Sequence, residues 1–260
     1  MTVYFIGAGP GDPDLITVKG QRLISQCPVC IYAGSLVPED VIASAPDSAL
    51  VIDSASLHLE EIMGIISKAH GEGKDVARVH SGDPSIYGAI AEQIERLKGL
   101  EIPYQIIPGV PAFAAAAAAF GQELTIPKIS QTLILTRTSM KSTDMPQDED
   151  LAILGASKAT LIIHLSVRNS LAIQRKLIPH YGENCPVIIA YRVGWPDQKI
   201  IRTDLNSLRD EIRAYKLTRT VLIFVGKSLD PKVIEESALY DKDHSHILRF
   251  KKRPKTDHSS

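Results

Sequence analysis

In the first half of the chain, short runs of apolar and β-branched residues alternate with longer amphipathic stretches. The apolar runs, which predict strands, cover residues 3–8, 29–34, 75–82 and 103–109. The amphipathic stretches between them, which predict helices, cover residues 15–26, 59–73 and 84–99. Alternation of this kind is typical of crossover units, whose strands run parallel in one sheet. We therefore expect an α/β fold whose N-terminal sheet is mostly parallel.

The corner SGDPSIYG, at residues 81–88, joins a predicted strand directly to a predicted helix. Pro84 suits the first helical position, which makes Asp83 the natural N-cap. A carboxylate at the C-terminal edge of a parallel sheet also lies where such sheets bind ligands. Both roles stay open for Asp83. Along the helix, Glu92 and Arg96 are spaced to pair on the solvent face, opposite an apolar face formed by Ile86, Ile90, Ile94 and Leu97.

Helical periodicity is lost across residues 121–128, and a new series of β-rich runs begins at residue 132. The turn WPDQ, at residues 195–198, separates two of these runs and predicts an antiparallel hairpin. The second sheet is therefore expected to be mixed. We predict two α/β domains, at residues 1–122 and 128–240, with the active site in the cleft between them. The basic segment 241–260 is predicted to be a disordered tail.

Composition excludes several classes of function. The chain has 29 Lys and Arg against 30 Asp and Glu, so it lacks the excess of positive charge that attracts nucleic acids. Its longest apolar run, residues 110–120, is too short for a membrane span, and no signal peptide precedes the first glycine-rich turn. We expect a cytoplasmic protein without a nucleic-acid or membrane partner. The three cysteines, including the CPVC pair, are expected to be buried structural thiols.

The loop GAGPGDPD, at residues 7–14, suggests a dinucleotide site, but its spacing is wrong. Asp12 stands where the third glycine of G-x-G-x-x-G is required, and two prolines remove amide donors. No Lys-Ser or Lys-Thr follows the glycines, which excludes a Walker loop. The loop remains a tight corner that either turns the chain or lets a bulky ligand approach the backbone closely.

The stretch PGVPAFAAAAAAFG, at residues 108–121, holds six consecutive alanines after Pro111. Alanine is the best helix former and proline fits the first turn, so a helix is predicted here. Its smooth surface suits either close packing in the core or close approach of a flat ligand. Both interpretations stay open from the residues alone.

Taken together, the opening VYFIGAGPGDPDLIT, the SGDPSIYG corner, PGVPAFAAAAAA and PVIIAYRVGWPDQ resemble the tetrapyrrole methylase family. The resemblance covers roughly residues 2–230. It implies a homodimeric methyltransferase that binds S-adenosylmethionine between its two domains and a tetrapyrrole in an adjoining trough. YAGSLVPEDV and RVHSGDPSIYGAIAEQI are most similar to members that methylate carbon 11 of precorrin-4, or of cobalt-precorrin-4, in cobalamin biosynthesis.

The resemblance also implies which residues surround the methyl donor. The positions that match the family pattern in the first half are Pro10, Gly82, Asp83, Ile86, Tyr87, Pro111 and Ala112. Those in the second half, whose motifs are looser, are Leu165, Ala190, Tyr191 and Thr220. Two other classes stay open: a related methylase with another target, such as a different ring carbon or a diphthamide intermediate, and a tetrapyrrole carrier without enzymatic activity.

Methyl transfer from a sulfonium needs orientation more than acid, base or metal chemistry. No ligand-spaced set of histidines is apparent, so we expect no metal, and no residue is assigned as a catalytic base. His80 and His164, at the ends of predicted strands, are either substrate contacts or structural histidines. The substrate of such an enzyme carries carboxylate arms, which arginine binds well. Candidates are Arg78, Arg137, Arg192 and Arg219.

Overall fold

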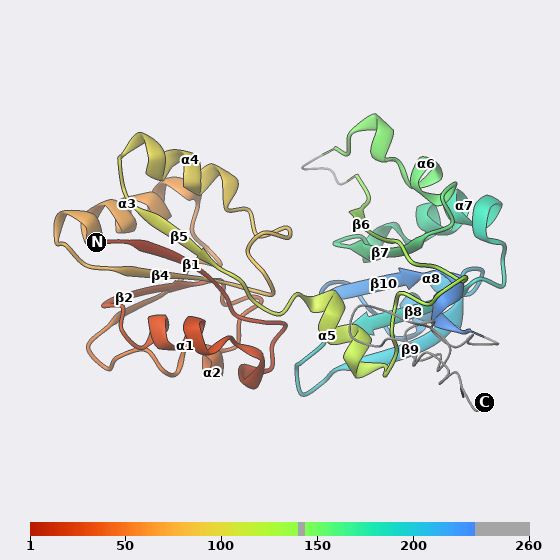
Figure 1. Ribbon diagram of the computed structural model, residues 1–260, viewed down its shortest axis with the longest axis horizontal. Coiled ribbons are helices and arrows are strands. Elements are labelled where there is room, and N and C mark those ends of the chain that lie inside the picture. The colour runs from red at the N-terminus through yellow and green to blue at the C-terminus, as the bar shows by residue number, and fades with distance from the viewer. Residues whose placement is uncertain (140–143, 232–260) are drawn as a thin grey trace, which may run out of the picture.

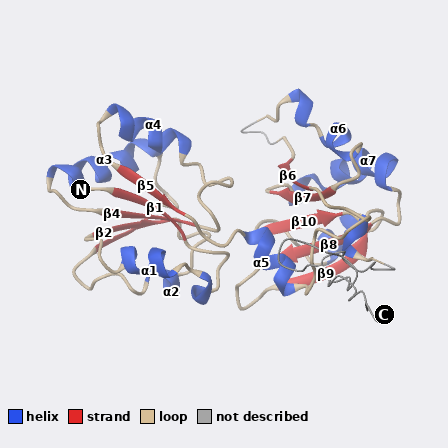
Figure 2. Ribbon diagram, viewed as in Figure 1, coloured by secondary structure: helices blue, strands red, loops and turns tan. Residues whose placement is uncertain are grey.

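The computed structural model describes residues 1–139 and 144–231, and Figure 1 shows them arranged in two lobes. Each lobe is built around one five-stranded sheet with helices packed on it, as the colouring of Figure 2 shows. The predicted α/β fold with two sheets is confirmed. The predicted tail, residues 241–260, lies outside the described residues.

The sheet of the first lobe has the strand order β3-β2-β4-β1-β5, and all its neighbouring strands are parallel. Its strands are β1 (Val3–Gly7), β2 (Val29–Tyr32), β3 (Leu50–Asp53), β4 (Val76–His80) and β5 (Tyr104–Ile107). The central strands β2 and β4 are buried along their whole length, whereas β3 lies at an edge and is largely exposed. This burial explains why β2 carries a continuous apolar sequence, whereas β4 also includes the buried Arg78 and His80.

Helices cover both faces of this sheet (Figure 1). One face packs on α3 (Leu59–Gly71) and α4 (Ala91–Gly99), and the other on α1 (Val18–Ile24) and α2 (Glu39–Ile42). Side chains of β1 alternate between the faces: Phe5 lies in the core under α3 and α4, and Ile6 in the core with α1 and α2. A strand buried on both sides requires this alternation.

The helix predicted to start at Pro84 begins seven residues later, at Ala91. Between them the chain makes tight turns, with positive φ angles of 56° at Tyr87 and 51° at Ala89 that a helix does not permit. The interpretation of Asp83 as a helix N-cap is therefore wrong. The ion pair predicted for Arg96 is also wrong, because Arg96 donates to Glu60 of α3 at 2.6 Å.

The sheet of the second lobe is mixed, with the order β6-β7-β10-β8-β9. β6 and β7 are parallel, and the other neighbours are antiparallel. Its strands are β6 (Leu133–Arg137), β7 (Thr160–His164), β8 (Pro186–Tyr191), β9 (Lys199–Asp204) and β10 (Val221–Val225). The predicted WPDQ hairpin is confirmed, since it joins the antiparallel strands β8 and β9.

One face of the second sheet packs on α6 (Leu151–Gly155), α7 (Ser170–Tyr181) and α8 (Leu208–Ala214). The alanine helix, α5 (Ala112–Ala119), packs on the other face, beside the connection from the first lobe (Figure 1). Ala115 and Ala116 are buried there, in one cluster with Phe120 and Phe224. The helix therefore contributes small apolar side chains to this core.

All three cysteines are free and buried, as predicted. Burial raises the pKa of the Cys27 thiol to about 12. It raises the pKa values of Cys30 and Cys185 to about 11. Thiols with raised pKa values carry little thiolate at neutral pH and are poor nucleophiles and metal ligands. They are part of the packed cores.

Candidate functional site

The carboxyl ends of three neighbouring strands of the first sheet meet at glycines. Gly7 ends β1, Gly82 follows β4 and Gly109 follows β5. A Cβ on Gly109 would lie 2.2 Å from the carbonyl oxygen of Gly82, and one on Gly7 would lie 2.5 Å from the amide nitrogen of Gly109. Gly9 and Gly82 also exchange backbone hydrogen bonds of 3.3 and 2.7 Å. The glycine-rich loop and the SGDPSIYG corner are therefore held together by direct backbone contact.

In the second lobe, three residues other than glycine adopt left-handed backbone conformations at one end of the sheet. Leu165 follows β7, Arg192 follows β8 and Thr220 precedes β10, with φ angles of 54°, 45° and 55°. Because β10 is antiparallel to β7 and β8, these three positions lie at the same edge. Such conformations cost roughly 1–3 kcal/mol each and gather at functional sites. We call the end of the second sheet that carries Leu165, Arg192 and Thr220 the strained edge. It faces the first lobe.

The glycine-rich loop of the first lobe packs on the hairpin turn of the second. A Cβ on Gly11 would lie 2.4 Å from both Cδ1 and Nε1 of the Trp195 indole. One on Gly194 would lie 2.8 Å from the amide nitrogen of Asp12. The Arg192 guanidinium carbon lies 4.0 Å from the centroid of the Trp195 ring, which restrains the indole further.

A cavity of about 790 Å³ lies between these elements and is lined from both lobes. Five of the residues predicted to surround the donor line it: Pro10, Ala112, Leu165, Ala190 and Thr220. The first two come from the glycine-rich loop and the start of α5, and the other three from the strained edge of the second sheet. The side chain of Leu165 is 55% exposed, although leucine usually lies in a core. A ligand in the cavity would cover it.

Six predicted residues do not line this cavity: Gly82, Asp83, Ile86, Tyr87, Pro111 and Tyr191. Gly82 and Pro111 are each next in sequence to a lining residue. The Tyr191 side chain packs against the core under the second lobe's helices. Asp83 is engaged by backbone: Oδ1 accepts from the Ser85 amide at 2.8 Å, and Oδ2 from the Gly109 amide at 3.0 Å. It holds two loops of the first lobe together.

Tyr87 reaches across to the second lobe. Its ring centroid lies 5.0 Å from that of the His164 imidazole, which lines the cavity. Burial lowers the pKa of His164 to about 4, and burial together with the nearby Arg78 charge lowers the pKa of His80 to about 3. Both imidazoles are therefore neutral at physiological pH. His80 is buried beside Phe5 and does not line the cavity, which fits its structural interpretation.

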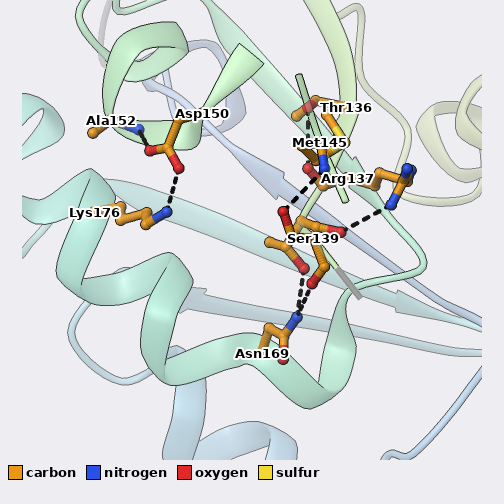
Figure 3. A network of polar contacts seen from close by, with 9 residues as sticks. Thr136, Arg137, Ser139, Met145, Asp150, Ala152, Asn169 and Lys176 are labelled. Atoms are coloured by element: carbon orange, nitrogen blue, oxygen red, sulfur yellow. Dashed lines mark hydrogen bonds and ion pairs between the residues drawn. The ribbon is translucent and has the colours of Figure 1, made fainter. Parts of the chain in front are cut away.

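A network of hydrogen bonds fixes the loop after β6 against the start of α7 (Figure 3). Asn169 Nδ2 donates to Thr138 Oγ1 at 2.7 Å and to the Ser139 carbonyl at 3.0 Å. Ser166 Oγ accepts from the Thr138 amide at 2.7 Å and donates to the His164 carbonyl at 2.6 Å. Ser139, Ser166 and Asn169 also line the cavity, so this network shapes its wall.

Sequence reasoning missed several lining residues, among them Arg168, Asn169 and Trp195. The first two lie four and five residues after the end of β7, in the loop at a strand end of the kind that identified the SGDPSIYG corner. That signal was present and could have found them. Trp195 was assigned only to a hairpin turn, since nothing local shows that the turn packs on a loop almost two hundred residues earlier.

Of the four arginine candidates, Arg219 lines the cavity and Arg78 does not. Arg78 is buried in the first lobe, where Nε donates to Gln93 Oε1 at 3.2 Å. Arg192 Nε donates to the Asp197 carboxylate at 2.6 Å. Arg137 donates to the backbone carbonyls of its own loop. The prediction that Arg78 meets a substrate carboxylate is therefore not supported by its position.

Within residues 1–139 and 144–231, no three histidine, cysteine or acidic side chains gather as metal ligands would. In the same part of the chain, none of the helices has both the length and the apolar character needed to cross a membrane.

Two α/β lobes with a cavity between their strand ends place the protein in the class of two-lobed α/β folds with a cleft for a ligand. The particular family follows from comparison with known proteins: residues 2–209 match the family model described as Tetrapyrrole (Corrin/Porphyrin) Methylases. The chain belongs to this family and is a methyltransferase.

Individual relatives are similar over almost the whole chain. The precorrin-4 C(11)-methyltransferase of Pseudomonas aeruginosa is 53% identical, covering 96% of this chain and 99% of the relative. The cobalt-precorrin-4 C(11)-methyltransferase of Methanocaldococcus jannaschii is 43% identical, covering 95% of each. Among solved structures, a cobalt precorrin-4 methyltransferase has a TM-score of 0.85 at 44% identity, covering 88% of this chain and 96% of that one.

Proposed function

We propose that the protein transfers a methyl group from S-adenosylmethionine to carbon 11 of precorrin-4, or of its cobalt form, in cobalamin biosynthesis. The observation that carries this proposal is the 53% identity to the Pseudomonas enzyme, which extends over 249 residues and includes both lobes. Identity at this level covers the cavity and its framing loops together. The proposal therefore concerns the whole site, not one motif.

The residues around the cavity fit the donor that this function requires. A cleft of this volume suits a small organic ligand. It is lined mostly by apolar and small side chains, with alanine at two of the five predicted contacts. Leu165 is held out of the core by a strained backbone, and a bound nucleoside would bury its exposed surface. We propose that Pro10, Ala112, Leu165, Ala190 and Thr220 contact the donor. Four of these side chains carry neither a charge nor a hydroxyl group.

Methyl transfer requires the protein to orient the donor and the macrocycle and to exclude water. S-adenosylmethionine, when bound, supplies a methyl group already activated by its sulfonium. Orientation can supply roughly 7–11 kcal/mol of a reaction barrier. The backbone contacts at the three glycines and the indole of Trp195 fix the loops that frame the cavity. These rigid walls are the contribution of this chain to the reaction.

The proposal is tested by incubating the purified protein with isotopically methyl-labelled donor and precorrin-4. We expect label to enter the macrocycle, with the new methyl at carbon 11 by nuclear magnetic resonance. Label at another ring carbon would replace this proposal with a different methylase activity. Binding of the macrocycle without any transfer, and without affinity for S-adenosylhomocysteine in calorimetry, would identify a carrier.

The relatives favour the metal-free substrate. Five relatives named for precorrin-4 are 47–53% identical, whereas two named for the cobalt form are 44 and 43% identical. We propose that precorrin-4 without cobalt is the preferred substrate. Mass spectrometry of products from equal amounts of both substrates gives the ratio directly, and faster conversion of the cobalt form would reverse the preference.

We also propose that the protein is a cytoplasmic homodimer with domains at residues 1–122 and 128–240. The dimer is an expectation from the family, and sedimentation equilibrium over a range of protein concentrations tests it. The domain division is supported by the two separate sheets, although α5 precedes the proposed boundary and packs on the second sheet. Limited proteolysis tests the division: cleavage between residues 122 and 128 would support it, and cleavage before α5 would move the boundary ahead of Ala112.

A further inference from the structure

The charged side chains that line the cavity are all positive. Two arginines, Arg168 and Arg219, are the charged residues that line it, and no aspartate or glutamate of the described residues does so. A neighbouring depression, which shares Trp195 with the cavity, is lined by three aspartates and by Arg192, which already pairs with one of them. Two adjoining spaces of the same molecule therefore differ in electrostatic character. Anionic groups are favoured in the first.

The sheet topology brings the two arginines to the same end of the second sheet, and both line the one cavity. Arg168 is in the short helical turn Val167–Asn169, which begins three residues after the end of β7, and Arg219 comes two residues before β10. β7 and β10 are antiparallel neighbours, with Ile163 opposite Ile223. The end of β7 and the start of β10 therefore lie side by side. Both guanidinium groups extend from the strained edge of the second sheet.

Neither guanidinium is occupied by a carboxylate of the described chain. Both side chains are exposed, and no ion pair joins either of them to residues 1–139 or 144–231. Arg78 and Arg192, in contrast, have their donors engaged by Gln93 and Asp197. A planar guanidinium binds a carboxylate through two parallel hydrogen bonds, which is the strongest pairing available to it.

We propose that Arg168 and Arg219 form a carboxylate-binding pair at the rim of the cavity. The proposal rests on the proposed function for the identity of the ligand, which presents carboxylates from two sources. One is the α-carboxylate of the methyl donor, and the other is the set of acetate and propionate arms of the macrocycle. Both would place a carboxylate against the same pair of guanidinium groups.

The test compares Arg168→Gln, Arg219→Gln and the double variant with the wild-type protein. Arg175→Gln is the matched control, because Arg175 is exposed on α7 and does not line the cavity. In the donor arm, calorimetry measures affinity for S-adenosylhomocysteine and for 5′-methylthioadenosine, which lacks the carboxylate. In the macrocycle arm, uroporphyrin III is titrated and followed through quenching of Trp195, the only tryptophan of the chain. Arg→Lys variants and thermal melts show whether a loss reflects misfolding.

We expect each Arg→Gln substitution to weaken one ligand by about tenfold, as the loss of one strong charged hydrogen bond implies. Weaker S-adenosylhomocysteine binding with unchanged 5′-methylthioadenosine binding assigns the pair to the donor. Weaker uroporphyrin binding, reduced further by salt, assigns it to the macrocycle. Unchanged binding of all probes, an equal loss in Arg175→Gln, or no binding to the wild type overturns the proposal. These arms need no turnover, so failure to methylate precorrin-4 refutes only the proposed function.

Discussion

Asp83 should act mainly by holding two loops together, and its replacement should therefore lower stability clearly. Its carboxylate accepts hydrogen bonds from the Ser85 amide, which is exposed, and from the Gly109 amide, which is partly buried. A hydrogen bond to a charged group contributes about 1.5–3 kcal/mol, and exposure places the Ser85 bond below that range. We expect Asp83→Ala to lower the free energy of unfolding by about 2–3 kcal/mol. Asp83→Asn, which keeps one acceptor oxygen, should lose about half as much.

The measurement is urea denaturation followed by circular dichroism, with Asp47→Ala as a control. Asp47 is exposed and forms no hydrogen bond within the described residues through its side chain, so its removal should leave the urea midpoint unchanged. Calorimetry with S-adenosylhomocysteine on the same samples separates the two possible roles of Asp83. Wild-type stability together with a large loss of donor affinity in Asp83→Ala would refute the reasoning, since it would show direct contact with the ligand.

Three further results are expected. Gly11→Ala should displace the Trp195 indole, because the new Cβ would lie 2.4 Å from it, and should shift the fluorescence emission and reduce donor affinity; an unchanged spectrum would contradict this packing. The lowered pKa values of His80 and His164, about 3 and 4, mean that the unfolded chain binds more protons below pH 6.5, so stability should fall as the pH falls from 6.5 toward 4. Replacing both histidines with glutamine should flatten that slope. The three buried cysteines should react with a thiol reagent only after denaturation, and rapid labelling of the native protein would disprove their burial.

The first sheet could be predicted from sequence because its strands are buried on both faces. A continuous apolar run such as Val29–Tyr32 is typical of a strand covered by helices on both faces. Leu50–Asp53 was missed for the opposite reason: it is a four-residue edge strand, largely exposed, and its residues carry no periodic signal. The start of α4 was placed too early because proline after aspartate is a common helix opening, whereas the glycine-rich packing at this corner imposes a tighter turn.

The candidate site was only partly accessible to the same reasoning. Strand ends in the first lobe are marked by glycine and proline, but Pro10 and Ala112 were assigned to the donor through the family resemblance, and both line the cavity. Tyr191 was placed at the right strand end, but its side chain points into the core, because alternate residues of a strand face opposite sides. Contacts between lobes, such as that of Trp195 with Gly11, depend on how two sheets meet, and no local pattern encodes that arrangement.

The left-handed residues of the second lobe connect these observations. Leu165, Arg192 and Thr220 each break a local backbone preference, and all three lie at one edge of one sheet. The Arg192 amide donates to the Thr220 carbonyl at 3.0 Å, so two of the strained residues hold each other in place. Local preferences alone would replace such residues with glycine, which adopts these angles without strain. Leu165 and Thr220 also line the cavity, so their strained backbone is consistent with the proposal that they contact the donor.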